Sequence, residues 1–187
     1  MACSDESLVA AHVAGDLTAF DALVRRHGPG LYGYLLRMTG HRHQAEDLFQ
    51  EVFRRIHEKA ASFSGRGAFR AWMYAVASRA VIDAARKRRR DQSVVDMRIK
   101  EGERLDPATA NPGAEAIAAE RRARVRQALD ALPPRQRETV ILVYYRHLSH
   151  AEAARVIGCS IGSVKRHMFR ALRSLSERLP DLREDAE

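Results

Sequence analysis

Apolar residues recur at helical spacing through almost the whole chain, and no segment shows the alternation of a strand. We therefore expect an all-α fold. Ser4 or Ser7 should cap the first helix, Thr18 should cap the second, and Gly40 should end the second helical stretch. The GPG motif at 28–30 is expected to interrupt that stretch. The helices predicted in the first half are 4–15, 18–27, 31–39, 45–59 and 69–90.

The helical pattern stops after the cationic run RKRRR. The stretch that follows, DQSVVDMRIKEGERLDPATANPG, carries five acids against three bases and two prolines, which is typical of a linker. Helical spacing returns from Glu115. We expect two small helical domains, at 1–90 and 115–187, joined by an irregular linker at 91–114.

Composition narrows the class of partner. The formal net charge is +8 and the sequence pI is near 10.1, a surplus that favours polyanionic ligands. Cys3 and Cys159 are the only cysteines, so we expect neither a disulfide framework nor a cysteine zinc site. No apolar run approaches the roughly 20 residues of a membrane span, and the first residues lack signal-peptide features. The chain is predicted to be cytoplasmic, with no cofactor and no small-molecule substrate.

The most specific local pattern is SHAEAARVIGCSIGSVKRHMFRALRSL, near the C-terminus. Ser149 and Glu152 fit a capping box at the start of one helix, and Ser160 can cap the next. Ala154 is small enough for two helices to approach, and Gly158 suits a turn that needs positive φ. The order of these residues predicts a helix-turn-helix motif.

The second helix of this motif has two distinct faces. Its inward stripe is expected to consist of Val164, Met168, Ala171, Leu172 and Leu175. Its outward face is basic, as docking into a DNA major groove requires, although a charged face on an ordinary helical hairpin is the alternative. That outward face comprises Lys165, Arg166, Phe169, Arg170 and Arg173.

The helix predicted at 69–90 carries a second cationic surface and ends in five consecutive cations. Complementing the helix dipole explains one or two of these cations but not all five. We therefore expect a second nucleic-acid surface, with aromatic side chains near the preceding loop that could stack on unpaired bases. Trp72 lies on the apolar stripe and is expected in the core. The residues off that stripe are Arg79, Asp83, Arg86 and Lys87.

An acidic patch stands out in the segment AEDLFQEVFRRIHEK. Its apolar residues fall on one helix face, and Asp47, Gln50, Glu51 and Arg54 fall on the opposite face. Asp47 and Glu51 are like charges four residues apart, a spacing that destabilises an isolated helix by roughly 0.2–0.5 kcal/mol. The spacing suggests a role beyond helix stability.

Four uses of this patch remain open: a catalytic pair, a metal site with His41 and His43, a solvated helix face, or a docking surface for a basic partner. A catalytic pair needs a sheltered pocket, and no nucleophile is near. A metal site needs more committed ligands than the spacing supplies. Docking explains the like charges best.

Three stretches, DLFQEVF, FRAWMYAVASRAVIDAARKRRR and LPPRQRETVILVYYRHLSHAEAARVIGCSIGSVKRHMFRALRSL, occur in this order. Over about Asp16 to Leu179 the chain resembles the extracytoplasmic-function group of bacterial sigma factors. The resemblance implies a promoter-specificity subunit, not an enzyme, that directs core RNA polymerase to specific promoters. It also implies control by an anti-sigma factor, which in this group is often membrane-anchored.

The resemblance further implies a role for each surface. The clamp coiled coil of the polymerase largest subunit would be bound by Asp47, Gln50, Glu51 and Arg54. The melted minus-ten element would be captured by Phe63, Arg66, Arg79, Asp83, Arg86 and Lys87. The minus-thirty-five element would be read as a duplex by Ser163, Lys165, Arg166, Phe169, Arg170 and Arg173.

Two dipeptides depart from the family pattern. Members often have Arg-Asn where this chain has Ser78-Arg79, and Ser-Arg where it has Arg166-His167, so base contacts at both places are in question. Two other classes of protein remain possible. One is an ordinary helix-turn-helix regulator that binds a palindromic duplex unaided, and the other is a metal-dependent enzyme that processes nucleic acids through the acidic patch.

Overall fold

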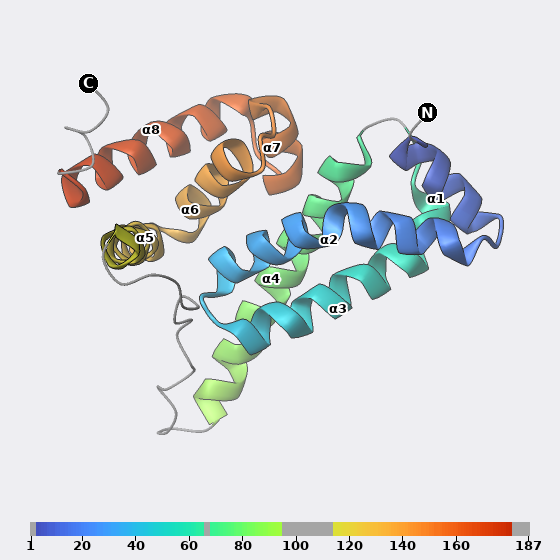
Figure 1. The fold of residues 1–187 in the computed structure, drawn as a ribbon, viewed down its shortest axis with the longest axis horizontal. Coiled ribbons are helices and arrows are strands. Elements are labelled where there is room, and N and C mark those ends of the chain that lie inside the picture. The colour runs from blue at the N-terminus through green and yellow to red at the C-terminus, as the bar shows by residue number, and fades with distance from the viewer. Residues whose placement is uncertain (1–2, 66–67, 95–113, 181–187) are drawn as a thin grey trace.

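The computed structural model describes residues 3–65, 68–94 and 114–180. Within these ranges the regular elements are helices, with no strand, so the expected all-α class is confirmed (Figure 1). The short element η1 is a 3-10 turn and η2 is a π-helical turn. In chain order the elements are α1 (Asp5–Val13), α2 (Leu17–Thr39), α3 (Arg42–Lys59), η1 (Ala60–Ser62), α4 (Phe69–Val94), α5 (Ala114–Asp130), α6 (Pro134–Val140), η2 (Ile141–Tyr145), α7 (His150–Ile157) and α8 (Ile161–Arg178).

The GPG motif does not interrupt α2, which runs unbroken through Pro29. The expected break is therefore wrong. A Cβ at Gly28 would lie 3.4 Å from the Phe49 ring, so this glycine lets α3 pack closely on α2. Tertiary packing outweighs the local helix-breaking tendency of glycine and proline, because propensity is only a weak preference beside burial.

Capping residues set the other ends of α1 and α2. Ser4 caps α1, and Gly40 ends α2 with a left-handed φ of 73°, as expected. The expected cap of α2 at Thr18 is wrong. The Asp16 carboxylate instead accepts hydrogen bonds from the Thr18 and Ala19 backbone amides, at 2.8 and 3.3 Å. Asp16 sits one residue before the helix, where its side chain can reach these orphan amides.

Helices α1 to α4 form the first domain and bury a common apolar core. Leu31 of α2, Val52 of α3 and Met73 of α4 are fully buried in it. Trp72 is partly buried against the same core, as its place on the apolar stripe predicted. Helix α4 continues to Val94, four residues past its expected end.

The helix-turn-helix geometry is as predicted. The Ser149 hydroxyl accepts from the Glu152 amide at 3.2 Å, and the Glu152 carboxylate accepts from the Ser149 amide at 2.8 Å. Gly158 takes a left-handed φ of 74°. The Ser160 hydroxyl accepts from the Ser163 amide at 3.1 Å and caps α8. The motif therefore occupies α7 and α8.

One residue of the expected inward stripe of α8 is wrong. Val164 and Ala171 are fully buried, whereas Leu172 is 53% exposed. At about 100° per residue, Leu172 lies roughly 80° around the helix from Val164, while the other stripe residues lie within about 40°. Leu172 is thus at the edge of the face that packs on the rest of the domain.

The two domains touch in the described structure. Figure 1 shows α6 and α7 lying alongside α2 and the first half of α4. Helix α6 is in contact with α2, and α7 is in contact with α4. Ile141, Leu142 and Val164 belong to the same cluster of buried residues as the core of the first domain. Residues 95–113, most of the expected linker, lie outside the described ranges, and the exact domain limits stay a prediction.

None of the described helices combines the length and apolarity that a membrane crossing requires.

Candidate functional site

The outer face of α3 carries the acidic patch that the sequence singled out. Asp47, Gln50 and Arg54 are exposed there, and Glu51 is half-buried. Within the described ranges the Asp47 carboxylate forms no ion pair or hydrogen bond. Asp47 is therefore the one acid of the patch whose charge is open to a partner.

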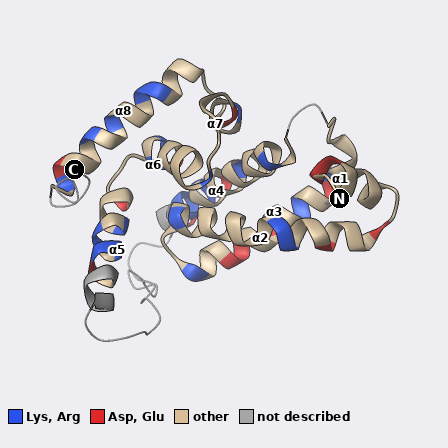
Figure 2. Cartoon of the chain, turned by 45° about the horizontal axis from the view of Figure 1, so that its top comes forward, with Lys and Arg blue, Asp and Glu red and all other residues tan. Residues whose placement is uncertain are grey.

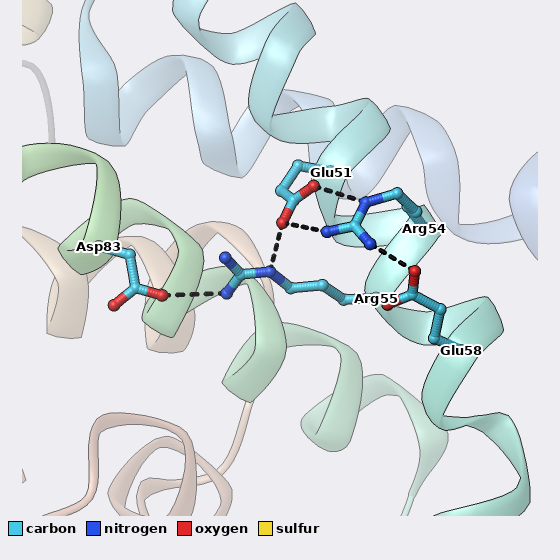
Figure 3. Close-up of polar contacts among 5 residues, drawn as sticks. All are labelled: Glu51, Arg54, Arg55, Glu58 and Asp83. Carbon is cyan, nitrogen blue, oxygen red and sulfur yellow. Dashed lines mark hydrogen bonds and ion pairs between the residues drawn. The ribbon is translucent and has the colours of Figure 1, made fainter. Parts of the chain in front are cut away.

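Glu51 instead organises a network of ion pairs (Figure 3). Arg54 donates to its carboxylate through two nitrogens, at 2.8 and 2.7 Å, and Arg55 donates at 2.6 Å. Arg55 also donates to Asp83 of α4 at 3.0 Å, and Arg54 pairs with Glu58. Hydrogen bonds from Arg55 and Arg54 hold the pKa of the Glu51 carboxyl below its usual value. Glu51 lies on the outward side of α3, as its place on the helix predicted, but its charge is paired within α3 to Arg54 and Arg55, and Arg55 in turn joins α3 to α4.

The histidines before and within α3 do not assemble a metal site with these acids. His41 is half-buried at the N-terminus of the helix, and exposed His43 lies 3.7 Å from Glu46. Over the ranges that the structure describes, no group of three or more His, Cys, Asp or Glu side chains converges as metal ligands would.

Helix α4 presents a row of exposed side chains about one turn apart. They are Arg79, Asp83, Arg86 and Lys87. Arg55 of α3 neutralises the Asp83 carboxylate, so the charge that this row presents to a partner is that of its three cations.

Phe63 stands just before α4 and is half-buried. Its ring centroid is 5.1 Å from that of Trp72 and 6.0 Å from that of Phe69. The three rings form an aromatic cluster at the N-terminal end of α4, in which Phe69 is fully buried and the half-buried Phe63 and Trp72 could stack on unpaired bases. Arg66, the remaining predicted contact of this surface, lies outside the described residues.

Ser78, half of one dipeptide that departs from the family pattern, is buried and donates to the Glu138 carboxylate at 2.5 Å. Tyr34 donates to the same oxygen at 3.1 Å. Burial, and then the nearby Glu138 carboxylate, raise the pKa of the Tyr34 hydroxyl well above its usual value, so Tyr34 remains a donor. Sequence reasoning missed this cluster, and the unusual serine was the one signal that pointed to it.

Helix α8 presents the second basic surface (Figure 2). Lys165, Arg166 and Arg170 are exposed and, among the described residues, take part in no ion pair. Phe169 is 69% exposed on the same side, as expected. Arg173 is exposed too, but it pairs with Glu177 at 3.1 Å.

Ser163 differs from the other predicted residues of α8. It is half-buried, and its hydroxyl lies 3.0 Å from that of the capping Ser160. The structure thus gives it a local role at the start of the helix, where it also neighbours the basic face.

Two family descriptions match the chain. Residues 23–91 match Sigma-70 region 2, and residues 122–175 match Sigma-70, region 4. The first match spans most of α2 and all of α3, and reaches into the last turns of α4. The second covers most of α5 and extends through the helix-turn-helix into α8.

Two relatives align over nearly their full length. The RNA polymerase sigma-H factor of Pseudomonas aeruginosa is 29% identical over 97% of each chain. The ECF RNA polymerase sigma factor SigK of Mycobacterium bovis is 30% identical over 92% of each chain.

Two solved structures are similar in fold. One is a co-crystal structure of the sigma factor RpoE in complex with the anti-sigma factor NepR from Bartonella quintana. It has a TM-score of 0.75 and 25% identity over 88% of this chain and 99% of that one. The other is CnrH in complex with the cytosolic domain of CnrY, with a TM-score of 0.71 and 26% identity over 94% and 97%.

Proposed function

Because the chain belongs to the extracytoplasmic-function group of RNA polymerase sigma factors, which are transcription initiation factors, we propose a division of work among its surfaces. Helix α3 docks on the clamp coiled coil of the polymerase largest subunit. The α4 surface holds the melted minus-ten element, and α8 reads the minus-thirty-five duplex. The observation that carries this proposal is the presence, in one chain, of two separate basic surfaces and one polar helix face.

The docking role of α3 is supported by its exposure and charge. Asp47 and Gln50 face outward without a partner among the described residues, and Arg54 stands beside them. A free carboxylate at the centre of such a face attracts a cationic coiled coil and helps to fix its register. Glu51 supports the face from within by fixing Arg54.

The two DNA roles are supported by different chemistry. The α4 surface combines cations with the half-buried rings of Phe63 and Trp72, which pack over the buried Phe69, as a single strand requires. The α8 surface has exposed arginines on a helix that a preceding helix positions, as major-groove reading requires. Together they favour a promoter that is partly duplex and partly melted.

We also propose that the chain acts in the cytoplasm, as a protein without enzymatic activity, under the control of a membrane-anchored anti-sigma factor. Support comes from the similar sigma factor RpoE, solved in complex with an anti-sigma factor, and from CnrH, solved with a cytosolic domain.

A charge reversal on α3 tests the docking role. Asp47→Lys should abolish co-purification with core polymerase, because it places a cation against a cationic partner. The matched control is Asp21→Lys on α2, an exposed position with the same change of charge, which should bind normally. Normal binding by Asp47→Lys would refute the docking role of α3. Tight binding of a palindromic duplex without polymerase would favour an ordinary regulator instead.

A further inference from the structure

A buried carboxylate lies at the contact between the two domains. Glu138 of α6 is 3% exposed. One of its oxygens accepts hydrogen bonds from Tyr34 of α2 and Ser78 of α4, and the other accepts from Arg135 at 3.2 Å. A buried carboxylate is tolerated only when such donors surround it. Two of its three donors belong to the opposite domain, so Glu138 is fully satisfied only while the domains are together.

Two arginines cross the same contact. Arg146 donates to the Gly30 carbonyl at 2.9 Å, and Arg70 donates to the His147 carbonyl at 3.1 Å. A Cβ at Gly30 would lie 3.1 Å from the Arg146 guanidinium, so the second glycine of the GPG motif makes room for this arginine. His147 has a φ of 52°, an unfavourable conformation for a residue with a side chain. The contact holds it there through its carbonyl.

The second domain also contacts the α4 surface proposed to hold the minus-ten element. Arg155 of α7 lines a cavity of about 240 Å³ together with Phe63 and Trp72. Phe63 and Trp72 belong to the aromatic cluster proposed to hold unpaired bases. While α7 packs on α4, part of this surface is covered.

The described arrangement is too compact to occupy both promoter elements. The minus-ten and minus-thirty-five elements lie about 25 base pairs apart, which is roughly 85 Å at about 3.4 Å per base pair. A compact chain of 187 residues has a radius of gyration of about 16 Å and a diameter of roughly 42 Å. The segment 95–113 is long enough to let the domains separate by tens of ångströms, since an extended residue spans about 3.5 Å.

We propose that the contact centred on Glu138, Tyr34 and Ser78 is an intramolecular latch that keeps the free chain closed and inactive. Opening exposes the α4 surface and frees α8 to reach the second element. The conformational part of the proposal is independent of function. Its inhibitory consequence rests on the proposed function of α4 and α8.

A series of variants in the full chain tests the latch. Ser78→Glu sets a second carboxylate against Glu138 and should open the chain, because like charges repel strongly where water is excluded. The milder pair Tyr34→Phe with Ser78→Ala removes both donors from the opposite domain. It should shift the opening equilibrium about 100-fold, at roughly tenfold for each hydrogen bond to a charged group. The matched control is Thr139→Val, which removes the hydrogen bond of a fully buried side chain to the Arg135 carbonyl, within α6.

Two readouts report the conformation directly. X-ray scattering should give the wild-type chain and the control a radius of gyration of about 16 Å, and Ser78→Glu a clearly larger one. Trp72 is the only tryptophan, so acrylamide quenching of its fluorescence should rise when α7 leaves. Circular dichroism should show unchanged helix content in every variant.

The outcomes separate the latch from the proposed function. A folded Ser78→Glu chain with the wild-type radius and quenching overturns the latch. If Ser78→Glu unfolds, the Tyr34→Phe and Ser78→Ala pair decides by the same readouts. An opened variant that binds single-stranded minus-ten DNA no better than the wild type overturns the inhibitory role. If opening occurs but no form binds either promoter element, the latch stands and the proposed function of α4 and α8 fails.

Discussion

Helices α3 and α8 each have 18 residues and set a charged face opposite an apolar one, yet they use their charges differently. On α3, Glu51 holds Arg54 and Arg55, and Arg55 reaches across to α4. On α8, Lys165 and Arg170 take part in no ion pair with other described residues. One helix uses most of its charge to hold the fold together, and the other keeps its charge for a ligand.

The difference separates two kinds of charged residue that look alike in sequence. A charge that is paired within the fold contributes modestly to stability and is costly to recruit for binding. An unpaired surface charge contributes little to stability and is ready for a polyanion. On α3, Glu51 is paired, so Asp47 is the acid of the patch whose charge remains available to a partner in the described structure.

Reversing the free charges of α8 should have the largest effect. Arg166→Glu combined with Arg170→Glu should weaken binding of promoter duplex by about 30-fold or more, because each lost contact contributes about 1–3 kcal/mol. Stability should change little, since neither arginine has an ion pair in the described structure. Titration of a labelled minus-thirty-five duplex and urea unfolding of the same samples would measure both effects.

The single substitution Arg170→Ala sharpens this test. If Arg170 reads a base edge, the variant should bind the promoter duplex more weakly by about 1–3 kcal/mol and scrambled DNA much less so. Equal losses on both would make Arg170 a phosphate contact. Arg178→Ala, at the far end of α8, makes the same change of charge and should bind like the wild type.

Removing Arg55, the central arginine of the α3 network, should lower stability and leave DNA binding unchanged. Arg55→Ala takes away partners of both Glu51 and Asp83, so the unfolding free energy should fall by about 1 kcal/mol. DNA binding by α8 should be unchanged. In urea, the midpoint should fall while the slope stays constant, because the surface exposed on unfolding is the same.

Lys59→Ala is a suitable comparison, because this exposed cation lies on the same helix outside the network. An Arg55→Ala protein as stable as Lys59→Ala would remove the distinction between the two helices. In that case the charges of α3 would be as available as those of α8.

Local sequence rules predicted the elements whose causes are local. The capping box of Ser149 and Glu152, the turn at Gly158 and the exposed side of α8 all follow from residues within one or two turns of each other. Leu172 was wrongly assigned to the buried stripe of α8 because it is apolar. Its angle around the helix predicts its exposure better than its residue type does.

The misses share a different cause, which is contact between distant residues. Gly28 packs on Phe49, Arg55 reaches Asp83, and Glu138 bonds to Tyr34 from 104 positions away. Patterns within one helix carry no information about such pairs. The acidic face could therefore be found from sequence, but the share of its charge already used within the fold could not.

Acid titration offers the smallest and most selective effect. The pKa of Glu51 is lowered by hydrogen bonds from Arg55 and Arg54, from a usual value near 4.5. A carboxyl whose pKa is lowered by folding contributes its full stabilisation at pH values above its usual pKa. This contribution is lost as the pH falls through the lowered pKa. Stability from the α3 network should therefore be constant near neutral pH and decline below about pH 4.5.

Glu51→Gln isolates this contribution. The variant should be less stable than the wild type near neutral pH by well under about 1 kcal/mol, since the pair is partly solvated. The gap should close as the pH falls from 6 toward 3, because the wild-type carboxyl becomes neutral as well. Urea midpoints across this range would show the convergence. The same measurement on Arg170→Ala should show no pH-dependent gap, because no carboxylate of the described structure pairs with Arg170; a gap there would mean that α8 also spends its charge on the fold.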